Sequence, residues 1–178
     1  MIETGATYTN PRSGGRATVL ESWRDNGGER FRFERVLPPG TGKAAAHYHL
    51  DYEQRFEIVA GTATMLVDGE RRTLSGGESI ELTRGARHAD PWNEAAGELT
   101  TRMQIAPVPK FIESYVETWV ERFTQGRLNA QDELPFLQLL VIAQATDSQS
   151  FAAQPPRAIQ RATAPLLAAI GRLRGYRA

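Results

Sequence analysis

The stretch PPGTGKAAAHYHLDYEQRFEIVAG, residues 38–61, decides how this chain of 178 residues is interpreted. Within it, His47 and His49 are separated by one residue, while Phe56 and Ile58 alternate with charged residues. Alternation with a period of two is typical of a β-strand with one buried face. Residues two apart on a strand point to the same side, so both imidazoles can reach one point in space.

A second stretch, GESIELTRGARHADPWN at residues 77–93, contains His88 after a turn at Gly85. Between the two stretches, Asp68-Gly69 predicts a two-residue β-hairpin, because type I′ turns need positive φ angles. The chain has only three histidines and no cysteine. A lone histidine is more often a surface or core residue, but three in one pattern favour a metal site. Without cysteine, thiolate zinc sites, iron–sulfur clusters, disulfides and thiol catalysis are excluded.

Together the two stretches resemble the two motifs of the cupin superfamily, in its single-domain cupin 2 form. The residues that fit the motifs are His47, His49, Gly61, Gly77, Gly85, His88 and Asn93. Thr83 replaces a proline of the second motif, and Gly40 and Asn93 are each displaced by one residue. The resemblance covers about residues 16–107 and implies a mainly β fold, a double-stranded β-helix or jelly-roll barrel. It also implies one divalent metal ion (Fe, Mn, Ni, Cu or Zn).

Gln54 occupies the position where the cupin motif has a glutamate as fourth ligand. The ligand set that the resemblance implies is therefore His47, His49, Gln54 and His88. Glutamine offers only a neutral carbonyl oxygen, which is a weaker ligand and leaves the site one charge more positive. Two interpretations stay open: Gln54 is a weak fourth ligand, or the metal site has decayed and the barrel binds its ligand without metal.

Other polar residues are weaker candidates for substrate binding. Arg102 and Gln104 share one face of a predicted strand at 99–105 and line the pocket if that face points inward; a solvated outer face explains them equally well. Tyr48 and Trp92 either wall the pocket or pack. Asp90 follows His88 by two residues and either orients an imidazole or caps the turn.

After Pro107 the period changes to that of helices. Apolar residues recur at steps of three and four from Pro109 to Gly126, which predicts an amphipathic helix. A second helix is expected at 134–145, buried because it is apolar nearly all round, and a third follows with Pro165 kinking or splitting it. We thus expect a barrel domain at 16–107 and a helical extension at 108–178, packed on the barrel or on a partner subunit.

The partners are limited by charge and hydropathy. Lys and Arg number 21, and so do Asp and Glu, so the chain has no net charge and no nucleic-acid partner is expected. The longest apolar run, residues 139–143, is too short to cross a bilayer, so no membrane partner and a cytoplasmic location are expected. The apolar stripe with Trp119 and Phe123 must be buried somewhere, which favours a homodimer.

Two classes of function follow from the resemblance. The first is a metal-dependent enzyme acting on a small organic molecule, as an oxidoreductase of dioxygenase type or as a Lewis-acid isomerase or decarboxylase. The second is a non-enzymatic barrel that binds or senses a small molecule, with a weakened or absent metal site. No general base beyond the ligands is evident in the sequence, which favours redox or Lewis-acid chemistry.

Overall fold

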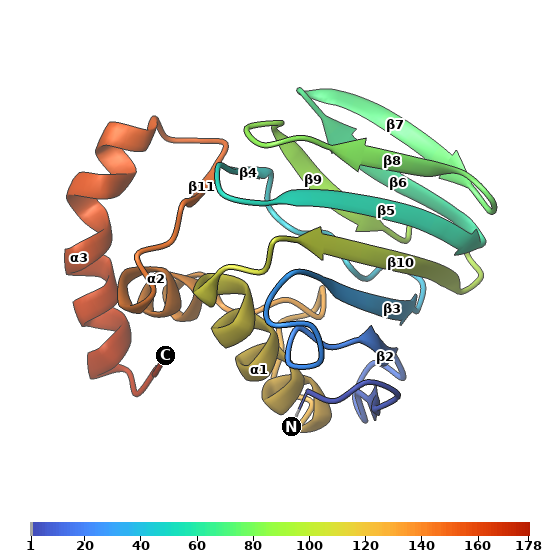
Figure 1. Cartoon of the computed structure of the whole chain (residues 1–178), viewed down its shortest axis with the longest axis horizontal. Coiled ribbons are helices and arrows are strands. Elements are labelled where there is room, and N and C mark those ends of the chain that lie inside the picture. Colours follow the sequence, from blue (N-terminus) through green and yellow to red (C-terminus); the bar gives the residue numbers. More distant parts are fainter. Residues whose placement is uncertain (1) are drawn as a thin grey trace.

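A computed structural model describes residues 2–178, and Figure 1 shows their arrangement as a β-sandwich barrel with helices beside it. The strands are β1 (Thr7–Thr9), β2 (Arg16–Glu21), β3 (Phe31–Leu37), β4 (His47–His49), β5 (Glu53–Ala60), β6 (Thr62–Val67), β7 (Glu70–Ser75), β8 (Ser79–Leu82), β9 (His88–Trp92), β10 (Leu99–Ala106) and β11 (Ser150–Ala152). The helices are α1 (Lys110–Thr124), α2 (Phe136–Ala145) and α3 (Arg157–Leu173). The predicted mainly β barrel followed by a helical extension is confirmed.

Two antiparallel sheets build the barrel. One has the strand order β1-β2-β3-β10-β5-β8 and the other the order β11-β4-β9-β6-β7. Between them, Phe56 of β5 packs in one cluster with Met65 of β6 and Trp92 of β9. The hairpin predicted at Asp68-Gly69 joins β6 to β7, and both residues have positive φ.

The register of the six-stranded sheet determines which side chains point inward. Phe31 lies opposite Ile105, and Ile105 lies opposite Gln54. Directly paired residues of an antiparallel sheet point to the same side, so these three share the inner face. The intervening residues, such as Arg102 and Gln104, belong to the outer face.

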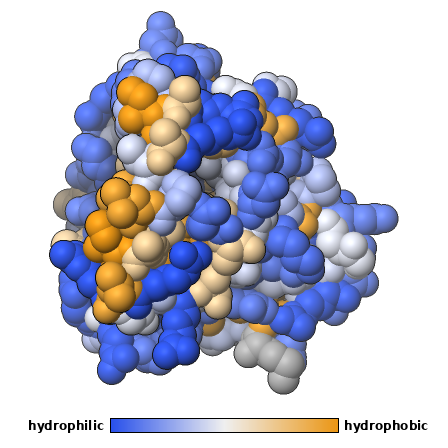
Figure 2. Space-filling model, turned by 90° about the vertical axis from the view of Figure 1, so that its left-hand side faces the viewer, coloured by the Kyte–Doolittle hydropathy of each residue, from blue (hydrophilic) through white to orange (hydrophobic). Residues whose placement is uncertain are grey.

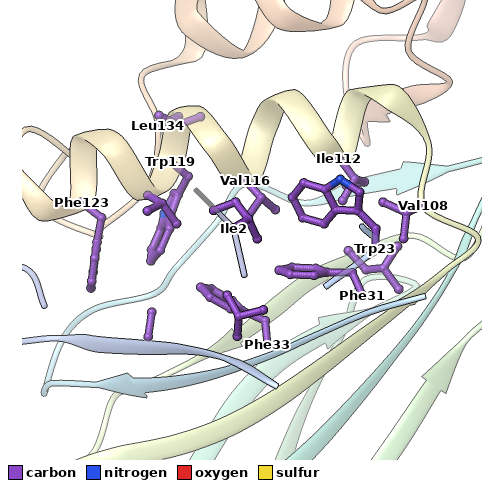
Figure 3. Close-up of a cluster of buried hydrophobic side chains, with 14 of the residues drawn as sticks. Ile2, Trp23, Phe31, Phe33, Val108, Ile112, Val116, Trp119, Phe123 and Leu134 are labelled. Carbon is purple, nitrogen blue, oxygen red and sulfur yellow. The ribbon is translucent and has the colours of Figure 1, made fainter. Parts of the chain in front are cut away.

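Helix α1 covers the part of this inner face that the second sheet leaves open. In Figure 3, Val116, Trp119 and Phe123 point from α1 toward Phe31 and Phe33 of β3. The Trp119 ring meets the Phe33 ring edge-on at 5.7 Å between centroids. The apolar stripe with Trp119 and Phe123 is therefore buried within the chain itself. A homodimer remains a prediction, but this stripe no longer supports it.

The second and third helices differ from their predictions in detail. α2 buries Val141 and Ile142, whereas Phe136 is 59% exposed, so the expected burial of α2 holds for one side of the helix only. α3 runs through Pro165 from residue 157 to 173, so the proline does not split it. No helix in the described part of the chain is both long enough and apolar enough to span a membrane.

The short strand β11 was not foreseen from the sequence. It follows α2 and pairs with β4, with Phe151 opposite Tyr48 and Ala152 opposite His47. The helical region thus contributes a strand to the barrel. Residues on both sides of the predicted boundary at 107 pack in one hydrophobic core. Strand β11, from beyond that boundary, also belongs to one of the two sheets of the barrel.

Candidate metal centre

The three histidines meet inside the barrel, as the spacing predicts. His47 and His49 lie on β4 and His88 on β9, with His47 directly opposite His88. The ring of His88 lies 4.5 Å from that of His47 and 5.0 Å from that of His49, measured between centroids. His49 and His88 are buried, whereas the side chain of His47 is 26% exposed. Solvent therefore reaches the site on the side of His47 and Asp90.

Each imidazole is held through its Nδ1 atom by a backbone carbonyl. The Nδ1 atoms lie 2.9 Å from the carbonyl oxygen of Ala45 for His47, 2.9 Å from that of Tyr52 for His49, and 3.0 Å from that of Ala86 for His88. Because a carbonyl only accepts, each Nδ1 carries a proton and donates it. A neutral imidazole then presents a bare lone pair at Nε2, the arrangement found around histidines that bind metals.

Burial keeps two of these imidazoles neutral. It lowers the pKa of His49 and brings the pKa of His88 down to about 4, even though the charge of Asp90 acts in the opposite direction. At neutral pH both Nε2 atoms are therefore acceptors. Both face the same oxygen, because Gln54 Oε1 lies 2.9 Å from Nε2 of His49 and 3.0 Å from Nε2 of His88.

Asp90 brings a carboxylate to the same point. Its Oδ1 lies 3.5 Å from Nε2 of His88 and 3.8 Å from Nε2 of His47, and it is buried without a hydrogen bond. His47, His88 and Asp90 together could hold a metal ion, because their ligand atoms lie within 4.8 Å of one another. A carboxylate that oriented a histidine would face Nδ1, so Asp90 sits where a ligand would. Its position two residues after His88 on a strand was the sequence signal for this shared face.

The donor set fits a divalent cation. Several lone pairs that point at one another repel, and a buried carboxylate oxygen without a partner is costly. A cation among these atoms would satisfy all of them. Without a cation, the Gln54 amide turned by 180° could donate from its NH₂ group to both Nε2 atoms. In the structure that NH₂ group instead donates to Met103 Sδ at 3.2 Å.

A second group of ionisable residues reaches the barrel interior from the extension. Tyr115 donates from its hydroxyl to Glu133 at 3.1 Å, and Arg35 donates to the other oxygen of Glu133 at 3.3 Å. Burial raises the pKa of Glu133 and that of Tyr115, and the negative charge of Asp90 raises both further. Sequence analysis missed this group, because two of its members lie in the region interpreted only as packing helices.

The four predicted substrate-binding residues do not gather around the histidines. Arg102 forms ion pairs with two glutamates of the outer face, and Gln104 lies on the same outer face, so the solvated-face alternative holds for both. Tyr48 alternates with the two histidines of β4 and packs on Phe151, with 5.6 Å between ring centroids. Trp92 is buried in the core, with the Lys43 ammonium 5.2 Å from its ring centre. Tyr52, which was not a candidate, stacks on the His49 ring at 3.8 Å.

Part of the chain is similar to known proteins. Residues 33–99 match the family model of the cupin domain. A predicted oxalate decarboxylase from Thermotoga maritima is 21% identical over 59% of this chain and 93% of its own, with a TM-score of 0.48. KdgF from Halomonas sp. is 16% identical over 56% of this chain and 84% of its own, with a TM-score of 0.47. A cupin 2 conserved barrel domain protein from Salinispora arenicola is 22% identical over 60% and 86%, with a TM-score of 0.44. No curated protein matches the chain, and none of these similarities bears on activity.

Proposed function

We propose that this chain, whose residues 33–99 match the family model of the cupin domain, binds one divalent transition-metal ion at its three histidines, with Asp90 as the anionic ligand. The observation that carries the proposal is the convergence of Nε2 lone pairs on a buried carboxylate oxygen that has no hydrogen bond. Asp90 supplies the charge that is missing at Gln54, whose carbonyl oxygen is a neutral fourth or fifth ligand.

The proposed activity is that of a metal-dependent enzyme acting on a small organic molecule, of dioxygenase or Lewis-acid type. Iron, manganese, nickel, copper or zinc bound here would polarise a substrate oxygen or exchange electrons with the substrate. The protein's own contribution is to hold the imidazoles through their Nδ1 atoms and to leave access past His47. Glu133 and Tyr115 form a hydrogen-bonded pair whose raised pKa values suit them to hold a proton in the interior.

Elemental analysis of untagged protein after reconstitution with each metal tests the proposal. We expect about one equivalent in the parent, as for a single site built from three histidines. The double variant His47→Ala, His49→Ala should lose the metal, and Asp90→Asn should weaken binding by about 10- to 100-fold. Glu70→Gln, an exposed carboxylate on β7, is the control and should leave the metal content unchanged. An unchanged metal content in the double histidine variant would contradict the proposal.

A metal-free binding barrel is the second candidate, and the amide of Gln54 favours it. Turned by 180°, this amide would bridge His49 and His88 with two hydrogen bonds and so replace the cation between them. A parent protein that takes up no metal on reconstitution, yet binds a small molecule past His47, would establish this alternative.

A further inference from the structure

Helix α3 exposes an apolar stripe along its whole length. Ile159, Leu166 and Leu173 are 50%, 68% and 89% exposed, and they are spaced seven residues apart. Seven residues are close to two helical turns, so the three side chains lie in one line, and the exposed alanines 162 and 169 fill the gaps between them. Figure 2 shows apolar side chains gathered on the face of the molecule that α3 occupies.

The opposite side of α3 is fixed to the protein. Ala168 and Gly171 are its buried residues. A Cβ atom on Gly171 would lie 2.7 Å from Cγ2 of Val141 and 3.0 Å from the carbonyl oxygen of Leu137, so the α3 backbone lies directly on α2. The side of α3 that contacts α2 is thus narrow and close-packed. The apolar stripe faces away from α2, and no part of the described chain covers Ile159, Leu166 or Leu173.

The charge around the stripe has one sign. Residues 148–178 contain five arginines and no acidic residue, whereas the first 147 residues carry the other 16 basic residues and all 21 acidic ones. Arg172 lies on one flank of the stripe and Arg174, directly after the end of α3, on the other. Arg161 instead extends over the ring of Phe151, 5.6 Å from the ring centre. No arginine of α3 forms an ion pair within residues 2–178.

We propose that α3 docks the protein reversibly onto an anionic lipid surface. An amphipathic helix with low mean hydropathy, leucines on one face and arginines beside them lies in the plane of a membrane interface. The leucines would enter the acyl boundary while the arginines reach back to the lipid phosphates. A second copy of the chain is a poorer occupant, because it would bring an equally basic helix against this one. An anionic lipid surface repels the rest of the protein, which is acidic, so the protein would approach the lipid with α3 first.

Flotation of the full-length protein with lipid vesicles tests the proposal. We expect it to bind vesicles of phosphatidylcholine with about 30 mol % phosphatidylserine at least tenfold better than vesicles of phosphatidylcholine alone. Raising the salt to about 0.5 M should release most of the bound protein, because it screens the arginines. Equal binding to neutral vesicles, or no binding to either kind, would overturn the proposal.

Two pairs of variants separate docking on α3 from general adhesion. Leu166→Asp with Leu173→Asp should lower vesicle binding at least tenfold, while Phe136→Asp, an exposed apolar residue of α2, should not change it. Arg172→Gln with Arg174→Gln should lower binding to anionic vesicles, while Arg72→Gln with Arg84→Gln, two exposed arginines of the barrel, should not. All variants should melt as the parent does and keep its metal content.

Light scattering distinguishes lipid docking from the other possible occupant of the stripe, which is a second copy of the chain. A dimer that the two leucine variants convert to a monomer, in a parent that does not float with vesicles, would assign the stripe to a second copy and overturn lipid docking. These outcomes are independent of the metal site, whose failure would leave the vesicle result standing.

Discussion

Gln54 is the residue on which the chemistry of the site depends most directly. Its carbonyl oxygen lies within 3.0 Å of two imidazole nitrogens, so a change at this one atom alters the charge that a cation would meet. Asp90 already brings one negative charge to the same place, from the neighbouring sheet. Glutamine at position 54 is therefore compatible with a working metal site, because Asp90 contributes the negative charge that glutamine lacks.

Replacing this amide by a carboxylate should strengthen metal binding. We expect Gln54→Glu to raise affinity by about tenfold or more, about 1.4 kcal/mol, because an anion replaces a neutral ligand. Competition with a chelator of known affinity measures the change. Gln104→Glu is the matched control, since Gln104 lies on the outer face of β10 and its variant should bind like the parent. A Gln54→Glu variant that binds no better than the control would show that residue 54 is not a ligand.

The buried histidines should make the metal-free protein sensitive to acid. His88 has a folded-state pKa of about 4, below the value of 6.5 expected in the unfolded chain. Between these two values the unfolded chain binds a proton that the folded protein does not. The contribution of His88 to the free energy of unfolding is therefore fully present above pH 6.5 and is lost as the pH is lowered toward 4. The loss amounts to about 3 kcal/mol from this residue.

Denaturant unfolding of the metal-free protein at both ends of that window measures this dependence. His88→Gln removes the titrating group, so the variant should lose clearly less free energy of unfolding than the parent between the same two pH values. An equal loss in both proteins would assign the acid sensitivity to other groups.

At the scale of elements, β4 depends on a strand from the extension. Three residues of β4 pair with β11, whereas one pairs with β9. Phe151 at the centre of β11 packs on Tyr48 and lies under the guanidinium of Arg157, at 4.7 Å from the ring centre. The strand that carries two of the three histidines is thus held mainly by residues that follow the barrel in sequence.

Breaking β11 should therefore weaken metal binding without touching a ligand. We expect Phe151→Pro, which removes a strand N–H and the ring together, to lower affinity about tenfold or more by loosening His47 and His49. Phe151→Ala removes only the ring and should have the smaller effect. Calorimetric titration of the metal compares the two; identical affinities in parent and proline variant would mean that β4 is positioned without β11.

For the whole molecule, the barrel and α1 share one core and should unfold together. Trp119 is 2% exposed, stacks on Phe123 and donates from Nε1 to the carbonyl oxygen of Asp132 at 2.8 Å. We expect Trp119→Ala to cost about 3–5 kcal/mol and to shift a single unfolding transition seen by both far-UV and near-UV circular dichroism. Phe136→Ala, at an exposed apolar position, should stay within about 0.5 kcal/mol of the parent. Two separate transitions in Trp119→Ala would show that the barrel folds without α1.

Alternation along strands predicts short strands and the shared side of His47 and His49, whereas the cupin barrel and the place of His88 follow from the resemblance to the two motifs. It does not predict which face of β10 points inward, since Arg102 and Gln104 alternate with Met103 in either case. Whether Asp90 is a ligand or orients a histidine depends on which imidazole nitrogen it faces. The backbone carbonyls that accept from each Nδ1 determine this, because they turn Nε2 toward Asp90. β11 was missed because three residues, Ser-Phe-Ala, are too short to show a period.

The pairing of β4 with β11 also has a consequence for the order of events on the ribosome. Residues 150–152 are made about a hundred residues after the histidines of β4, so nascent chains contain both imidazoles long before the strand that holds them exists. Translation thus delays completion of the pocket until the barrel's other strands, and α1 and α2, have left the exit tunnel. A chain that stops before β11 would be released with its histidine strand unsupported, so the proposed metal site is completed late in biosynthesis.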